Sequence, residues 1–141
     1  MTKALFTGIT GLLGNYFLEK KKEKYFISGT YSNNKVNYKG VDLINLNVKE
    51  KVKVSELITR LKPQVVVQAA SIGNVDYCEN YPEEAHAVNV VGTRNVLEAC
   101  REVGAKIIFI ADTSDQKVIE EIHKMMKGSY LCAAGFFKLN E

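Results

Sequence analysis

The sequence predicts an α/β fold: a single domain in which a doubly wound parallel β-sheet lies between helices on both faces, in three α/β/α layers. Apolar runs of strand length alternate with helical patterns along the 141 residues, an order typical of parallel sheets. Several of these runs are almost entirely apolar, which indicates strands covered on both faces. The chain is long enough for one substantial core but short for two domains.

Five strands are expected in this sheet. They are Lys3–Thr7, Tyr25–Tyr31, Val41–Asn45, Gln64–Ala69 and Lys106–Ala111. A last apolar stretch, Ser129–Phe137, forms either a sixth strand of the same sheet or a strand that pairs with another chain. The segment Ser32–Gly40 is rich in Asn and Lys and is expected to be an exposed loop.

Four helices are expected between and after the strands. They are Leu12–Lys22, Lys49–Leu61, Pro82–Val103 and Gln116–Lys127. In the second helix, apolar residues recur at spacings of three and four and form one stripe. These residues are Val54, Leu57, Ile58 and Leu61. Pro63 ends the second helix, while Gly104 and Gly128 follow the third and the fourth.

Composition argues against several functional classes. The net charge is +3 and the basic residues are scattered, so no nucleic-acid partner is expected. No apolar run approaches the roughly 20 residues of a membrane span, and the N-terminus fits a core strand better than a signal peptide. Cys78, Cys100 and Cys132 lack CxxC spacing, and His86 and His123 lack paired ligands. We therefore expect reduced thiols, no metal site and a cytoplasmic location.

The most informative motif lies near the N-terminus, where Gly8, Gly11 and Gly14 join the first strand to the first helix. Such a turn presents free backbone N–H groups, here those of Leu12 and Leu13, together with the positive end of a helix dipole. Glycine permits the tight turn, the approach of a pyrophosphate and the packing of helix on strand. The motif predicts a Rossmann-type dinucleotide site, although a glycine-rich turn without a ligand remains the alternative.

The end of the second strand bears on which dinucleotide is bound. A carboxylate there would hold the ribose of NAD and repel a 2′-phosphate. The chain instead has Ser32, Asn33 and Lys35 in this region, with hydroxyl, amide and ammonium donors. This favours NADP(H), with NAD(H) as the alternative; an ordinary polar loop would also explain these three residues.

Five ordered blocks carry a resemblance to a known family. They are Thr7–Gly14, Val41–Leu43, Lys62–Ala70, Val75–Glu79 and Asn89–Leu97. Through these blocks the chain resembles the cofactor-binding half of the extended short-chain dehydrogenases/reductases, and most closely their dTDP-4-dehydrorhamnose reductase branch. The resemblance covers about residues 3–110 and leaves 111–141 as an unrecognised helix plus strand.

The resemblance implies roles for further residues. Asp42 and Leu43 match the pair that contacts the adenine, with Asp42 as a strand-end carboxylate; a turn cap is the alternative role for Asp42. Ala69, Ala70 and Ser71 match the loop that lines the nicotinamide ribose. Asn89 matches a helix asparagine near the nicotinamide. An equally good interpretation of Asn89 is a buried amide that joins backbone segments.

The catalytic apparatus that the resemblance implies is incomplete. Family chemistry uses a Ser or Thr together with a Y-x-x-x-K pair, in which the lysine lowers the tyrosine pKa. Tyr16 with Lys20 and Tyr31 with Lys35 have this spacing but lie at unsuitable positions, and Tyr130 has Ala134 in the lysine position. Thr113 and Ser114 are weak candidates for the catalytic hydroxyl, and an N-cap role explains them as well.

Two functional hypotheses follow. In the first, the chain is an NADP(H)-binding domain of a sugar-nucleotide reductase or epimerase, truncated or divergent, that is inactive alone and whose full-length parent would bind a nucleotide sugar. In the second, it is a non-catalytic nucleotide-sensing or regulatory module. A domain that folds but binds nothing well is a third possibility. Homo-oligomers are expected if Pro82–Val103 and the tail expose apolar surface.

Overall fold

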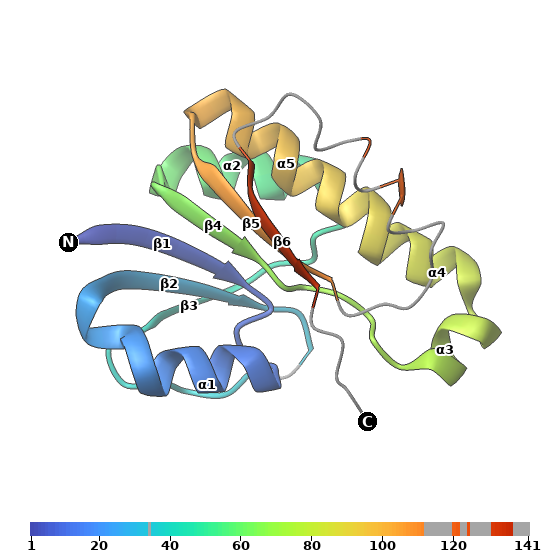
Figure 1. Ribbon diagram of the computed structural model, residues 1–141, viewed down its shortest axis with the longest axis horizontal. Coiled ribbons are helices and arrows are strands. Elements are labelled where there is room, and N and C mark those ends of the chain that lie inside the picture. Colours follow the sequence, from blue (N-terminus) through green and yellow to red (C-terminus); the bar gives the residue numbers. More distant parts are fainter. Residues whose placement is uncertain (34, 112–119, 122–123, 125–130, 137–141) are drawn as a thin grey trace.

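The computed structural model describes residues 1–33, 35–111, 120, 121, 124 and 131–136. In these residues one sheet has six parallel strands in the order β3-β2-β1-β4-β5-β6 (Figure 1). The strands are β1 Thr2–Thr7, β2 Tyr25–Tyr31, β3 Asp42–Asn45, β4 Val65–Gln68, β5 Lys106–Ala111 and β6 Leu131–Phe136. The doubly wound fold and the five expected strands are confirmed, and the last apolar stretch adds β6 to this sheet by pairing with β5.

The helical segments agree with the expectation in most places. They are α1 Leu12–Lys21, η1 Lys22–Lys24, α2 Lys51–Leu61, α3 Val75–Asn80, α4 Pro82–His86, η2 Ala87–Val91 and α5 Gly92–Val103. The expected helix Pro82–Val103 is helical throughout, but η2 is a π-helical turn inside it. Of the expected helix Gln116–Lys127, only Glu120, Glu121 and Lys124 are described, and they are helical.

The short helix α3 was not predicted. It begins where the Asn74 side chain accepts a hydrogen bond from the backbone N–H of Tyr77 at 2.8 Å, a typical N-cap. It buries none of its residues, so it shows no apolar stripe in the sequence. The exposed large apolar side chains Val75, Tyr77 and Tyr81 belong to this region.

The core has two parts, one on each face of the sheet. On one face, Leu5 packs with Val54 and Ile58 of α2 and with Val96 of α5. On the other face, Phe6 packs with neighbours that include Leu18 of α1. Adjacent residues of a strand point to opposite faces, so Leu5 and Phe6 serve the two parts. Figure 1 shows α1 on one side of the sheet and α2 with α5 on the other, which completes the three layers.

The expected apolar stripe of α2 is confirmed: Val54, Leu57 and Ile58 are buried, and Leu61 is partly buried against the same cluster. The apolar surface expected on Pro82–Val103 is not found, because no described side chain there is a large exposed apolar group. That helix packs its apolar residues inward against α2 and the sheet. Within the described parts of the chain, no helix has the length and apolar character needed to cross a membrane.

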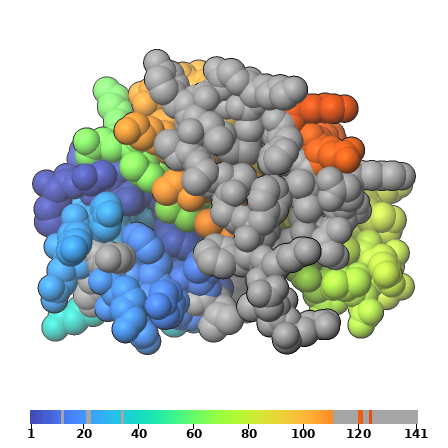
Figure 2. Space-filling view, viewed as in Figure 1, coloured from blue at the N-terminus to red at the C-terminus, as the bar shows by residue number. Residues whose placement is uncertain are grey.

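The strand order reverses beside β1, which pairs with β2 on one side and with β4 on the other. The connections that leave the carboxyl ends of β1 and β4 therefore diverge to opposite faces. In doubly wound sheets such a switch point is where ligands bind. The glycine turn after β1 lies at this position. In Figure 2 the blue surface of the N-terminal segments and the yellow-green surface of α3 and α4 lie on opposite sides of the face shown.

Candidate functional site

Gly8 and Gly14 are required by the packing of the turn itself. Gly8 has φ +66°, and a Cβ there would lie 2.9 Å from the Cα of Ala70. A Cβ on Gly14 would lie 1.9 Å from the carbonyl oxygen of Ile9. Real Cβ atoms do not approach backbone so closely, so a side chain at either position would push the turn away from β4 or from its own helix. These glycines allow the chain to fold.

Gly11 differs from the other two glycines. It is exposed, its φ lies outside the left-handed region, and a Cβ there would meet only the carbonyl oxygen of Gly8 at 3.5 Å, an ordinary contact. The folded chain therefore has room for a side chain at Gly11. A glycine at this point keeps the surface of the turn bare, so that another molecule can approach the backbone closely.

Hydrogen bonds fix the turn against β2. The N–H of Gly8 donates to Thr30 Oγ1 at 3.2 Å, and the N–H of Ile9 donates to the Thr30 carbonyl at 3.0 Å. The N–H groups of Leu12 and Leu13 belong to the first turn of α1, where an α-helix offers no internal acceptor. No acidic residue lies in that first turn, so no side-chain charge there offsets the positive end of the dipole. The turn is suited to an anion.

A buried polar pair joins the ends of β1 and β4 beneath this turn. The hydroxyl of Thr7 donates to Gln68 Oε1 at 2.7 Å and accepts from the N–H groups of Ala69 and Ala70 at 3.1 and 3.2 Å. Both Thr7 and Gln68 are almost completely buried. Sequence reasoning assigned no role to this pair. The signal was a polar residue at the end of each of two otherwise apolar strands.

The segment after β4 carries the predicted residues Ala69, Ala70 and Ser71. Ala69 and Ala70 are half-buried, with Ala70 against Gly8, and Ser71 is exposed. These residues therefore lie at the same edge of the sheet as the glycine turn. Their contact with a nicotinamide ribose stays a prediction.

Asn89 holds the chain that follows. Its Oδ1 accepts from the N–H of Ile72 at 2.7 Å, and its Nδ2 donates to the Ile72 carbonyl at 3.1 Å. Asn89 lies in the π-helical turn, and Thr93 Oγ1 donates to its carbonyl at 2.7 Å. This geometry matches the interpretation of Asn89 as an amide that joins backbone segments. It also fixes the loop that leaves the predicted nicotinamide side of the site.

Asp42 does not occupy the expected position. It is the first residue of β3 and pairs with Ser28, whereas the carboxyl end of β3 is Asn45, which pairs with Tyr31. Asp42 therefore lies about 10 Å behind the edge at which the glycine turn is found. The expectation that Asp42 is a carboxylate at the carboxyl end of its strand is therefore wrong, because Asp42 lies at the other end. Leu43 is also inside β3, half-buried in the core beside α1.

The residues that follow the carboxyl end of β3 are instead Asn47 and Val48, after Leu46. The Asn47 side chain accepts from the N–H of Lys49 at 3.1 Å, and Val48 is buried. Gly92 of α5 lies close over Val48, since a Cβ at Gly92 would be 2.5 Å from Val48 Cγ2. Sequence reasoning missed this turn because β3 is short and its register on β2 sets which residues reach the edge.

The predicted cofactor-selecting residues follow β2. Ser32, Asn33 and Lys35 are all exposed. Asn45 Nδ2 donates to the Ser32 carbonyl at 3.1 Å and lies 3.5 Å from the carbonyl of Tyr31, so β3 holds the start of this loop. The residues are thus brought to the carboxyl edge of the sheet, on the β2 side of the turn.

The structure does not assemble a Tyr–Lys proton donor in the described residues. Tyr16 is exposed on α1, where its ring lies 6.0 Å from Lys20 Nζ. Tyr31 is the last residue of β2, and its sequence partner Lys35 is exposed in the loop that follows. Thr113 and Ser114 lie outside the described residues. In the described part of the chain, no cluster of His, Cys, Asp and Glu suits a metal ion.

Comparisons with known proteins agree with this geometry. Residues 4–116 match the NAD dependent epimerase/dehydratase family. Methionine adenosyltransferase 2 subunit beta of Xenopus laevis is 32% identical over 111 residues, which cover 77% of this chain and 32% of that protein. In this relative, and in the two solved structures described next, the segment that this chain matches is about a third of the full length of the other protein.

Two solved structures have the same fold. UDP-glucose 4-epimerase from Thermus thermophilus, in complex with NAD, is 25% identical with a TM-score of 0.72 over 78% of this chain and 37% of that one. The dTDP-4-dehydrorhamnose reductase from Bacillus anthracis, in complex with NADP, is 25% identical with a TM-score of 0.64 over 79% and 36%. The resemblance seen in the sequence is confirmed, and this chain belongs to the NAD dependent epimerase/dehydratase family.

Proposed function

We propose that this chain is a dinucleotide-binding domain that takes NADP(H), with NAD(H) as the alternative, from a sugar-nucleotide reductase or epimerase. The observation that carries the proposal is Gly11. The fold needs glycine at Gly8 and Gly14, but it has room for a side chain at Gly11. A bare backbone at the start of a helix is explained by a ligand that must come close to it.

The residues around the turn fit the parts of a dinucleotide. Its diphosphate would accept from the N–H groups of Leu12 and Leu13 at the positive end of α1. The nicotinamide ribose would lie along Ala69–Ser71, where Thr7 binds the N–H groups of Ala69 and Ala70 and Asn89 holds Ile72, the next residue. The bound nicotinamide would supply hydride-transfer chemistry.

For the adenine end we propose Asn47 and Val48 in place of Asp42 and Leu43. Asn47 and Val48 follow the carboxyl end of β3, and Asp42 begins that strand. The buried Val48 gives the turn a fixed apolar base. A polar side chain beside an apolar one suits a flat base with an exocyclic amine.

The preference for NADP(H) that we propose depends on the residues that follow β2. Ser32, Asn33 and Lys35 offer donors and one cation to a 2′-phosphate, and the carboxylate that would favour NAD(H) is missing from these three positions. In a parent protein, a nucleotide sugar would complete the site. We also propose a cytoplasmic location, since Cys78 and Cys100 are free thiols.

The test is direct binding of NADPH to the purified chain and to Gly11→Ala, measured by isothermal titration calorimetry. We expect the alanine methyl to lower the affinity at least tenfold, because it occupies the space needed by the diphosphate. Thr59→Ala, on the exposed face of α2, is the control and should bind as the parent chain does. Equal NADPH affinity in Gly11→Ala and the parent would overturn the assignment of the site.

A second candidate function is a regulatory subunit without catalysis. It is favoured by Ala134 in the position where Tyr130 would need a lysine, and the relatives named methionine adenosyltransferase 2 subunit beta are by their name one subunit of a larger assembly. We expect no oxidation of NADPH when the chain is mixed with a dTDP-4-dehydro sugar. Measurable turnover by the chain alone would exclude this candidate. Association of identical copies also stays a prediction, which sedimentation velocity tests.

A further inference from the structure

The loop Ser32–Gly40 is tied to the glycine turn by one side-chain contact that the proposed function does not use. The phenol of Tyr38 donates to Asn15 Oδ1 at 2.5 Å. Asn15 in turn donates from Nδ2 to the carbonyl of Gly11 at 3.3 Å, and from its backbone N–H to the same oxygen at 3.2 Å. Tyr38 is therefore linked through one side chain to the glycine that faces the proposed diphosphate.

The same loop is fixed at its other end. Asn45 Nδ2 donates to the carbonyl of Ser32 at 3.1 Å. At the Tyr38 end, the N–H of Val41 also donates to the carbonyl of Tyr38 at 3.3 Å. The ring of Tyr38 is half-buried and packs against the core beside α1. Between these two anchors lie Asn33 and Lys35, both exposed. The two anchors set where these side chains stand relative to the turn.

We propose that the Tyr38–Asn15 hydrogen bond is a positioning contact for selection of the cofactor's 2′-phosphate. This inference rests on the proposed function of the glycine turn. In a dinucleotide, the covalent structure fixes the span between the diphosphate and the adenosine ribose. A protein that reads both groups must hold its two binding segments at a matching separation. Tyr38 and Asn15 join those two segments directly.

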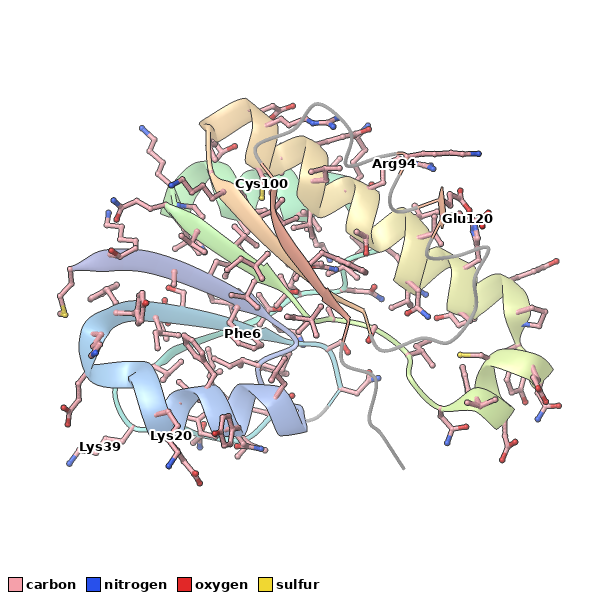
Figure 3. The ribbon with its side chains drawn as sticks, viewed as in Figure 1. Phe6, Lys20, Lys39, Arg94, Cys100 and Glu120 are labelled. Atoms are coloured by element: carbon pink, nitrogen blue, oxygen red, sulfur yellow. The ribbon has the colours of Figure 1, made fainter. Side chains whose placement is uncertain are left out.

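The physical reason is preorganisation. A loop that is already held in its binding conformation loses less conformational entropy when the ligand binds. The exposed side chains of the loop would otherwise sample many positions, and their contact with a phosphate would carry that cost. Lys39, the other cation of the loop, is labelled in Figure 3 beside Lys20, toward the C-terminal end of α1 and away from the glycine turn, so we assign the phosphate contact to Lys35.

Removing the phenol oxygen is expected to affect binding more than folding. Phe at position 38 keeps the ring in the core, and the exposed Asn15 can bond to water instead. The bond from Asn15 to Gly11 remains, so the diphosphate turn is unchanged. Only the part of the affinity that depends on the loop is lost. Tyr38→Phe should therefore weaken NADPH binding and spare NADH binding.

The experiment measures the ratio of the NADH to the NADPH dissociation constant in five proteins. They are the parent chain, Tyr38→Phe, Asn15→Ala, the double variant, and Tyr16→Phe as the matched control. Tyr16 is an exposed tyrosine on the same helix, and its ring contact with Lys20 is kept by phenylalanine. Losing one hydrogen bond predicts that Tyr38→Phe lowers the ratio about threefold to tenfold, while Tyr16→Phe leaves it unchanged.

The double variant distinguishes a tether from two separate effects. If Tyr38 acts through Asn15, the double variant should have the ratio of Asn15→Ala alone, because the second change removes nothing further. Multiplied effects would contradict the tether, and so would an unchanged ratio in Tyr38→Phe. A parent chain that binds neither dinucleotide contradicts the proposed function itself. A parent that binds both equally keeps the glycine site and overturns the selection by this loop.

Discussion

The three glycines of the turn have different reasons to be glycine. Gly8 has a positive φ and lies against Ala70, and Gly14 lies against the backbone of Ile9. Gly11 has neither constraint. Spacing in the sequence predicts the turn, but it cannot separate these reasons, because they depend on the distance to other backbone segments. Only the folded chain distinguishes a glycine needed for packing from one that serves a ligand.

Replacement of these glycines should separate stability from binding. Gly14→Ala places a methyl 1.9 Å from the Ile9 carbonyl oxygen, and we expect a loss of about 3 kcal/mol in the free energy of unfolding, because backbone must move. Gly11→Ala should change that free energy by no more than about 0.5 kcal/mol. Urea denaturation followed by circular dichroism measures both. Equal losses in the two variants would contradict this account of the turn.

Cys100 provides a pH dependence of stability. Figure 3 shows it on α5, and its side chain is buried against the sheet. Burial raises the pKa of its thiol from 9.0 to about 12, because the thiolate is poorly solvated there. The unfolded thiol loses its proton above pH 9 while the folded one keeps it. The folded state then binds more protons, so stability falls as pH rises from about 9 to 12.

The slope that Cys100 contributes is about 1.4 kcal/mol per pH unit within that range. We expect Cys100→Ala to remove this part of the slope, in a background where Cys78 and Cys132 are serine so that no other thiol contributes. Urea denaturation at pH 8.5 to 10.5 measures it. A slope that is the same with and without Cys100 would show that its thiol is not protected by the fold.

At the level of elements, α5 is fixed to the turn after β3 by one buried amide. Asn95 Nδ2 donates to the carbonyl of Val48 at 2.9 Å and lies 3.3 Å from that of Lys49. The same turn receives Gly92 of α5 over Val48. The turn that we propose for the adenine therefore depends on a helix more than 40 residues later in the sequence. Helical periodicity predicted α5, but not this partner.

Loss of the Asn95 side-chain amide should lower the free energy of unfolding. Asn95→Ala leaves the buried carbonyl of Val48 without its donor, and we expect a decrease of about 1 to 3 kcal/mol in the free energy of unfolding. Glu98→Ala, on the same helix, removes an exposed ion pair with Lys51 and should change it by less than about 1 kcal/mol. Chemical denaturation compares the two. A smaller loss for Asn95 than for Glu98 would contradict the role of the buried bond.

Two elements were not predicted from the sequence, each for its own reason. The short helix α3 buries none of its side chains, so it lacks the apolar stripe by which helices are found. The π-helical turn Ala87–Val91 is invisible in a helical pattern, since it changes the hydrogen bonds and not the residue types. It brings Asn89 to Ile72. Such turns often accompany functional sites, and here the contact fixes the loop after β4.

At the level of the whole molecule, the sheet consists of two halves, β3-β2-β1 and β4-β5-β6, which meet at the switch point between β1 and β4. The glycine turn and the loop after β2 come from one half of the wound sheet, and Ala69–Asn89 from the other. Thr7 joins the halves through Gln68 and the N–H groups of Ala69 and Ala70. A ligand that spans both halves would add a connection between them, so binding should stabilise the entire domain.

Thermal unfolding tests this linkage. With NADPH at 100 times its dissociation constant, binding to the folded state alone adds about 2.7 kcal/mol. For a chain of this size, we expect Tm to rise by about 5 to 10 °C. NADH at the same concentration should raise Tm less. Differential scanning calorimetry measures both shifts, and no shift with either dinucleotide would contradict binding at the switch point.

The sequence by itself determined the parallel doubly wound fold, the glycine turn at its start and the family, because apolar periodicity and glycine spacing are local in the chain. Tertiary structure decided which residues reach the site. The register of β3 on β2 put Asp42 behind the edge and Asn47 after it, and pairing across some sixty residues joined Thr7 to Gln68. The physical reason is that register and buried hydrogen bonds depend on contacts between distant segments, which no local pattern records.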